Sequence, residues 1–266
     1  MPSLPVGLGA LRGLLKEVET SASAETSLAV GGARELAVVL RRELGRDAAP
    51  GAMRAGDSPD GAAVLVYVLG RDPDEEDERA LKRARRSRTP VIAVAAGPVS
   101  GDVSIPYVLA TDVVRVGSGE GFPLDEIARM IAARLGEEGA PLAARVPVLR
   151  RAVCDTLISS FAKKNGILGA AVFIPGADLP LLTLNQARLV LRIAQAHGAP
   201  VGRERLPELA ATLGAGMGLR MVAREALDLI PFAGWALKGA VAYTGTRALG
   251  EAAVKRFEAG ATPPPA

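Results

Sequence analysis

Few side chains in this chain could carry out acid–base, nucleophilic or metal chemistry. Its 266 residues include one cysteine, Cys154, and one histidine, His197. One cysteine excludes a disulfide framework, a zinc site built from several cysteines and an iron–sulfur cluster, and it suits a reducing compartment. One histidine excludes most metal centres and leaves a single residue for a Ser–His–Asp triad. We therefore expect no catalytic residue, no metal and no cofactor.

Both residues have structural explanations. Cys154 falls in the apolar pattern of a predicted helix, which indicates a buried and inert thiol. His197 precedes Gly198 at a predicted helix end, where an imidazole can contact the last carbonyls. A hydrolase that uses Ser118 or Cys154 with His197 is an alternative, but these residues lie in separate segments and no motif supports it.

A strand-to-helix turn at Gly31 and Gly32 is where a phosphate-binding loop would lie. A P-loop has the form G-x-x-x-x-G-K-[ST], in which lysine and the hydroxyl hold the phosphates and Mg²⁺. Residues 31–38 instead continue into an apolar helix face. Gly31, Gly32 and Ser118 remain candidates for a residual anion site, because amides at a helix N-terminus attract anions.

Charge and composition restrict the partners. Lys and Arg number 32 against 29 Asp and Glu, but residues 1–150 carry a net charge of −2 and residues 151–266 carry +5. Aromatic residues make up 3% of the chain, which leaves little to stack on bases, so we expect no nucleic-acid partner. The basic second half, rich in small apolar residues, fits an acidic protein or an anionic membrane surface.

The first half alternates strand and helix patterns, which predicts an α/β fold with a parallel sheet. Continuous apolar runs predict strands at residues 27–33, 62–69, 91–95 and 113–116, and the segment 46–61 is expected to be a loop. Helices are predicted from Arg34, with a buried face that includes Val39, and at residues 124–135.

A charge-dense segment, residues 72–88, predicts a third helix. Asp72 is expected to be the N-cap and Glu75 the N3 residue of a capping box. Acids precede bases at (i, i+4) spacing, which indicates a solvated helix with internal ion pairs. As an alternative, four arginines could dock an anionic partner: Arg83, Arg85, Arg86 and Arg88.

The second half is predicted to be helical, at residues 150–164, 182–197, 203–213, 217–230 and 231–257, with a disordered tail at 258–266. Small residues recur every fourth position in the last helix and predict close helix approach: Ala236, Ala240, Thr244, Ala248 and Ala252. Asp178 and Lys238 interrupt the apolar stretches, so neither forms a clean transmembrane helix. Peripheral or hairpin membrane association and a soluble bundle both remain possible.

Residues 142–257 resemble the domain of unknown function 697. The resemblance lies in IPGADLP, in NQARLVLRIAQAHG and in the segment that begins IPFAGW. That family occurs fused to or beside Era-like GTPase domains, related bacterial members are inner-membrane proteins, and it has no established catalytic activity. The first half resembles a degenerate Era-like domain, with VIAVAAGP where the guanine-reading Asn-Lys-x-Asp would stand, and the chain between Ala33 and Ala62 is too short for switch regions.

We therefore expect four parts: an amphipathic helix and linker (1–26), a degenerate P-loop-like α/β domain (27–138), a helical domain (142–257) and a tail (258–266). The predicted function is a non-catalytic interaction or scaffold protein in the bacterial cytoplasm, with association with the inner face of the membrane and homo-oligomerisation as further expectations. The alternative is a guanine-nucleotide-responsive switch that does not hydrolyse. The interaction candidates are Asp178, Arg188, Arg192, Trp235 and Lys238.

Overall fold

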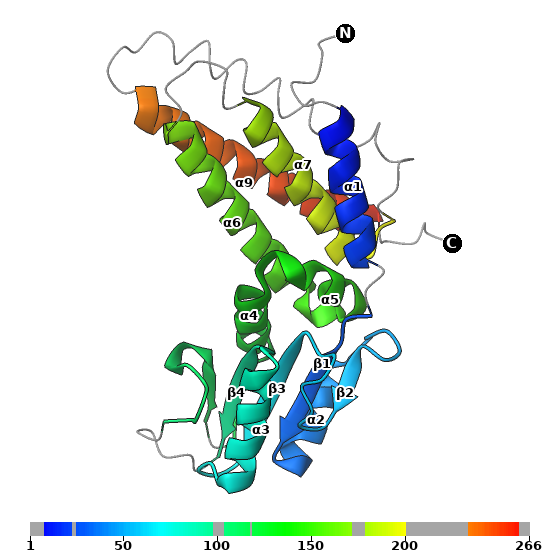
Figure 1. Ribbon diagram of the computed structural model, residues 1–266, viewed down its shortest axis with the longest axis vertical. Helices are drawn as coiled ribbons and strands as arrows, with labels where there is room; N and C mark the ends of the chain where they lie inside the picture. Colours follow the sequence, from blue (N-terminus) through cyan, green and yellow to red (C-terminus); the bar gives the residue numbers. More distant parts are fainter. Residues whose placement is uncertain are drawn as a thin grey trace. The chain divides into compact units, whose positions relative to one another are not determined.

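The computed structural model describes residues 8–22, 25–97, 104–117, 119–171, 179–200 and 234–260 (Figure 1). Contacts divide the chain into two compact units, Ala24–Val153 and Met1–Ser23 with Cys154–Ala266. The first is an α/β unit and the second is helical, as predicted. Helix α1 (Leu8–Ala22) belongs to the helical unit and does not stand apart as a separate segment, and the division falls inside α6 (Arg150–Ala171), not at residues 138–142.

The α/β unit is built on a five-stranded sheet in the order β2-β1-β3-β4-β5. All neighbouring pairs are parallel, with Leu28 opposite Val64 and Leu65 opposite Val91. Four strands match the predicted apolar runs: β1 (Leu28–Gly32), β3 (Val64–Leu69), β4 (Val91–Ala96) and β5 (Val113–Val116). Every residue of β3 is buried, as expected of a strand covered on both faces.

The prediction of a loop over residues 46–61 was wrong, because this segment contains the edge strand β2 (Met53–Ala55). It pairs in parallel with β1, with Met53 opposite Leu28. Its three residues are half-buried or exposed and none is β-branched, so neither periodicity nor strand propensity marked it.

Three helices pack on this sheet at the predicted positions: α2 (Arg34–Leu44), α3 (Glu75–Arg86) and α4 (Leu124–Leu135). The short helix α5 (Gly139–Arg145) follows α4. Helix α2 buries Ala37, Leu40 and Leu44. The expectation that Val39 lies on the buried face was wrong, since Val39 is 47% exposed and Ala37 takes that place.

The helical unit contains α1, α6, α7 (Leu179–Ala196) and α9 (Gly234–Gly260) within the described residues. Helix α7 packs against both α1 and α9 (Figure 1). Helices α6 and α9 approach closely through glycines: a Cβ on Gly169 would lie 2.9 Å from Ala242 Cβ, and one on Gly239 would lie 2.9 Å from Gly166 O. The predicted helices at 203–213 and 217–230 lie outside the described residues.

The small-residue stripe of the last helix does not form this contact. Ala240, Thr244, Ala248 and Ala252 are exposed. The packed face lies on another side of the helix, at Gly239, Ala242, Thr246 and Gly250. In the part of the chain that is described, no helix is both long and apolar enough to cross a membrane.

A buried polar network connects three helices of this unit. The amide of Asn165 on α6 donates to Thr246 Oγ1 on α9 at 2.9 Å, and Gln186 on α7 donates to the same oxygen at 3.2 Å. Asn185 donates to Asn165 Oδ1 at 2.8 Å, and Thr246 itself donates to the carbonyl of Ala242. Because buried polar groups must find partners, the network fixes the register of the three helices.

We expect Thr246→Val to destabilise the helical unit by about 1–3 kcal/mol, because it leaves two buried amides without an acceptor. Thr244→Val is the matched control: Thr244 also bonds to the carbonyl four residues earlier but is exposed, so its loss should stay within about 0.5 kcal/mol. Urea denaturation measures both changes, and equal losses would contradict the role of the network.

Candidate functional site

A hollow of about 740 Å³ opens at the carboxyl ends of β1 and β3. In this strand order the chain leaves β1 toward one edge of the sheet and leaves β3 toward the other. Doubly wound folds hold their ligands at such a switch point. The hollow is lined by residues 30–34, 37, 38 and 41 of β1 and α2, 55–57 after β2, 67–71 at the end of β3, and 76–77 of α3.

The floor of the hollow is the turn from β1 into α2. Gly32 adopts φ +92°, and a Cβ there would press on Val68, so only glycine fits this position. The N–H of Gly32 donates to Asp57 Oδ1 at 2.7 Å. The N–H of Ala33 donates to the carbonyl of Val68 at 2.8 Å. Both amides are therefore satisfied by the chain itself.

Asp57 thus occupies the place where a phosphate-binding turn would hold its anion. A Cβ on Gly31 would lie 2.9 Å from the carbonyl of Gly56 and would collide with the Asp57 carboxylate. Gly31 therefore allows the loop after β2 to lie against β1. Of the residues predicted for a residual anion site, Gly32 already has its N–H bound to an internal carboxylate, Gly31 lies against the same loop, and Ser118 lies outside the described residues.

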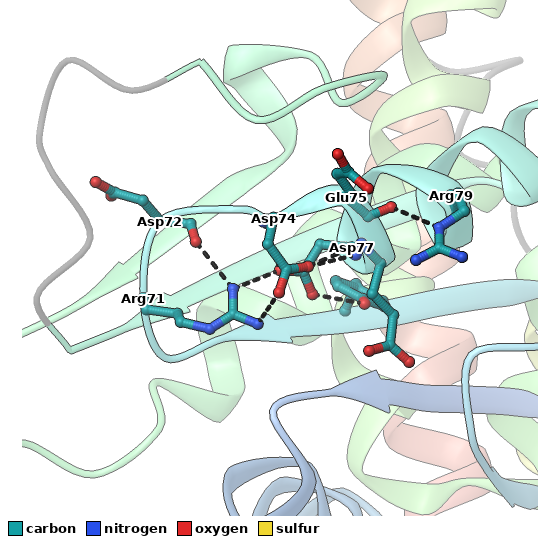
Figure 2. A network of polar contacts seen from close by, with 8 residues as sticks. Arg71, Asp72, Asp74, Glu75, Asp77 and Arg79 are labelled. Atoms are coloured by element: carbon teal, nitrogen blue, oxygen red, sulfur yellow. Dashed lines mark hydrogen bonds and ion pairs between the residues drawn. The ribbon is translucent and has the colours of Figure 1, made fainter.

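A second polar cluster lies at the end of β3, where Arg71 faces the start of α3 (Figure 2). Its guanidinium donates to Asp77 Oδ2 at 2.9 Å and forms an ion pair with Asp74. The hydroxyl of Tyr67 donates to Asp77 Oδ1 at 2.8 Å. Both oxygens of the buried Asp77 are therefore held by side chains of β3 and the loop that follows it.

This cluster raises the pKa values of Tyr67 and Arg71 and lowers the pKa of Asp74. Burial raises the pKa of Tyr67 well above its ordinary value, and the hydrogen bond to Asp77 raises it further. The pKa of Asp74 is lowered, chiefly by the hydrogen bond that it accepts from the N–H of Asp77. Tyr67 is therefore a neutral hydrogen-bond donor, and Asp74 is a carboxylate.

The capping box of α3 lies two residues later than predicted. Asp74, not Asp72, is the N-cap and accepts from the N–H groups of Glu76 and Asp77. Asp77, not Glu75, is the N3 residue and accepts from the N–H of Asp74 at 3.0 Å. Arg71 explains the shift, because it binds both carboxylates of the later pair.

Helix α2 forms the basic wall of the hollow. Arg34 and Arg41 line it, and neither has an ion pair or a side-chain hydrogen bond with any residue in the described ranges. Val38 lies between them on the helix and is 52% exposed. On the opposite wall, Glu76 of α3 likewise has no ion pair with the described residues. The charges of Arg71 and Asp77, in contrast, neutralise each other.

Most predicted interaction residues lie elsewhere. Arg188 and Arg192 on α7 bind Glu17 of α1 at 2.7 and 3.1 Å, so they hold the chain's own N-terminal helix. Lys238 is half-buried on α9. Asp178 lies outside the described residues, and only the backbone of Trp235 is described, in α9.

The lone thiol and imidazole lie in the helical unit. Cys154 is 1% exposed, as predicted. His197 Nδ1 contacts the carbonyl of Ile193 at 2.9 Å, which confirms the expected contact at the helix end, and its ring stacks on Phe257. In the described ranges no three His, Cys, Asp or Glu side chains gather as they would around a metal ion.

Sequence reasoning missed the residues that define the hollow: Asp57, Tyr67 and Arg71 lay in a predicted loop, in a buried strand and beside a charge run. The sequence pattern that could have indicated the site is the pair Gly56-Asp57 directly after β2, at the carboxyl ends of the strands, where Gly31-Gly32 also lies. It was hidden because β2 itself was not predicted.

A scan against protein-family profiles and a search of curated proteins both returned no match.

Tyr67 predicts a pH dependence of stability. The unfolded chain releases this proton near the ordinary pKa of 10.0, whereas the folded unit retains it, so stability that is full below pH 10 falls as the pH rises. Tyr67→Phe should flatten the decline in unfolding free energy between about pH 9 and about pH 11 in urea denaturation. Tyr107→Phe, which removes a more exposed tyrosine, should leave the wild-type slope, and an unchanged slope in Tyr67→Phe would contradict the assignment.

The hydrogen bond between Gly32 and Asp57 leads to a prediction about stability and phosphate binding. Asp57→Ala should cost about 1–3 kcal/mol of unfolding free energy, because the Gly32 N–H loses its acceptor. Inorganic phosphate should then raise the melting temperature of Asp57→Ala more than that of wild type, since the amide is free to bind it. Asp60→Ala is the control on the same loop, and equal phosphate responses in all three proteins would show that Asp57 does not occupy an anion site.

Proposed function

We propose that this chain is a non-catalytic interaction protein, whose α/β half is a degenerate relative of Era-like GTPase domains and whose helical half is of the 697 type. The observation that carries the proposal is the bond from Gly32 N–H to Asp57. The turn after β1 carries no lysine or serine for phosphates and Mg²⁺, and its amide already binds an internal anion. A bound triphosphate would have to displace a carboxylate and would meet its charge.

The remaining walls of the hollow agree with this proposal. Asp77 is held by Arg71 and Tyr67, so it is not free to act as a base or to bind a metal. Arg34 and Arg41 give the hollow charge that recognises a partner. Binding, without chemistry, is what these groups support.

The helical half supports an interaction role in a different way. Its helices are joined by the network of Asn165, Gln186 and Thr246, all buried, and by glycine contacts between α6 and α9. Buried hydrogen bonds between the described helices hold this half together, which suits a structural support. We propose that the rigid helical half carries the α/β half to its partner.

Nucleotide titration tests this function. With Mg²⁺ present, GTP, GDP and ATP at about 1 mM should leave the melting temperature unchanged. A nucleotide that bound the folded protein with a Kd well below this concentration would raise the melting temperature. No phosphate release above the buffer rate is expected. A catalytically active P-loop GTPase measured in parallel shows that the assay detects both effects.

Two outcomes contradict the proposal. Turnover of GTP above the buffer rate would make the protein an enzyme. Micromolar binding of GTP or GDP without turnover would favour the alternative, a nucleotide-responsive switch, for which the position of the hollow at the switch point is the supporting observation.

A further inference from the structure

Within the described residues, the two walls of the hollow carry charges of opposite sign that form no ion pair. Arg34 and Arg41 lie two turns apart on α2, about 10 Å along the helix axis. Across the hollow, Glu76 of α3 lines the opposite wall and Glu75 precedes it in the first turn of that helix, outside the lining. Neither carboxylate has an ion pair with the described residues. Of the other charged groups of the hollow, Arg71 is paired with Asp77, and the Asp57 carboxylate accepts a hydrogen bond from the Gly32 N–H.

An apolar surface lies beside the basic wall. Val38 is one turn from each arginine and is 52% exposed, and the adjacent Val39 is 47% exposed. Large apolar side chains that are exposed within a charged surface are typical of protein contacts. Several wall residues, Arg34, Val38, Arg71 and Glu76 among them, are exposed, so a small molecule here would remain largely open to solvent. Ligand sites usually bury most of their ligand, which favours a macromolecular partner.

We infer that this hollow docks a second copy of the chain in a two-fold symmetric dimer. A two-fold interface requires one patch to carry each group together with its complement. The opposed walls meet this requirement: Arg34 and Arg41 of each copy face Glu75 and Glu76 of the other, and Val38 of each copy lies between its two arginines, against the start of α3 of the other. An acidic or basic partner would be attracted by one wall and repelled by the other.

This inference deepens the proposed interaction function and rests on it, by naming the partner. The two can still fail separately. Nucleotide turnover would overturn the proposed function while leaving the oligomeric state to be measured, and a monomeric protein would overturn the dimer while the absence of nucleotide binding stands.

A charge-reversal experiment on the full chain tests the dimer. Light scattering after size exclusion, at about 1 to about 200 μM, should show a dimer that weakens with added salt. Arg34→Glu/Arg41→Glu makes both walls acidic, and Glu75→Arg/Glu76→Arg makes both basic. Each variant alone should raise the dimer Kd by about 30-fold or more, because like charges then face each other.

Mixing the two variants is the decisive step. An equimolar mixture should form a heterodimer, since the acidic walls of one variant face the basic walls of the other. This recovery excludes misfolding as the cause of the single-variant losses. Arg83→Glu/Arg86→Glu is the matched control, because it reverses two exposed arginines of α3 that do not line the hollow, and it should dimerise like wild type.

Three results would overturn the inference. The first is a wild type that stays monomeric over the whole concentration range. The second is either reversal variant dimerising as tightly as wild type. The third is a mixture of the two variants that remains monomeric while circular dichroism shows both to be folded.

Discussion

The hydrogen bond between the Gly32 amide and the Asp57 carboxylate determines the character of the α/β unit. It fixes the loop after β2 against the end of β1, and so it forms the floor of the hollow. It also places a negative charge at a strand-to-helix turn, the position at which doubly wound folds that bind nucleotides accept a phosphate. Gly31 and Gly32 are needed for this contact, because a side chain at either position would collide with Asp57 or with Val68. The glycines that first suggest a phosphate loop therefore serve an internal bond.

The strands and helices that the sequence predicted correctly are mostly those with a buried face. Strands β1, β3, β4 and β5 and helices α2 and α4 were predictable because their apolar residues recur with the spacing of a covered strand or an amphipathic helix. Helix α3 was predictable from its capping residues and from the spacing of its acids and bases. What failed depends on contacts distant in sequence. β2 is a strand only through its pairing with β1, and Asp74 displaces Asp72 as the cap only because Arg71 binds it. Asp57 could not be placed beside Gly32, 25 residues away, once β2 was missed.

In the helical unit, the most regular sequence pattern did not mark the buried helix contact. The stripe of Ala240, Thr244, Ala248 and Ala252 is the most regular feature of the last helix, yet these residues are exposed. The buried face combines glycines with Thr246, a composition that no apolar periodicity marks. Polar residues select this face because Asn165 and Gln186 need an acceptor in the interior. Specificity in this bundle therefore comes from hydrogen bonding more than from apolar pattern.

The docking of α1 has a consequence for synthesis of the chain. Glu17 binds Arg188 and Arg192, so the first helix packs on a segment made more than 170 residues later, after the entire α/β unit. At roughly 5–20 residues per second, α1 emerges from the ribosome about 10–35 s before its binding surface exists. During that time the apolar face formed by Leu14, Leu15 and Val18 has no partner in α7, while the α/β unit can fold first. The helical unit is thus completed last, and chaperone binding to α1 would be confined to this interval.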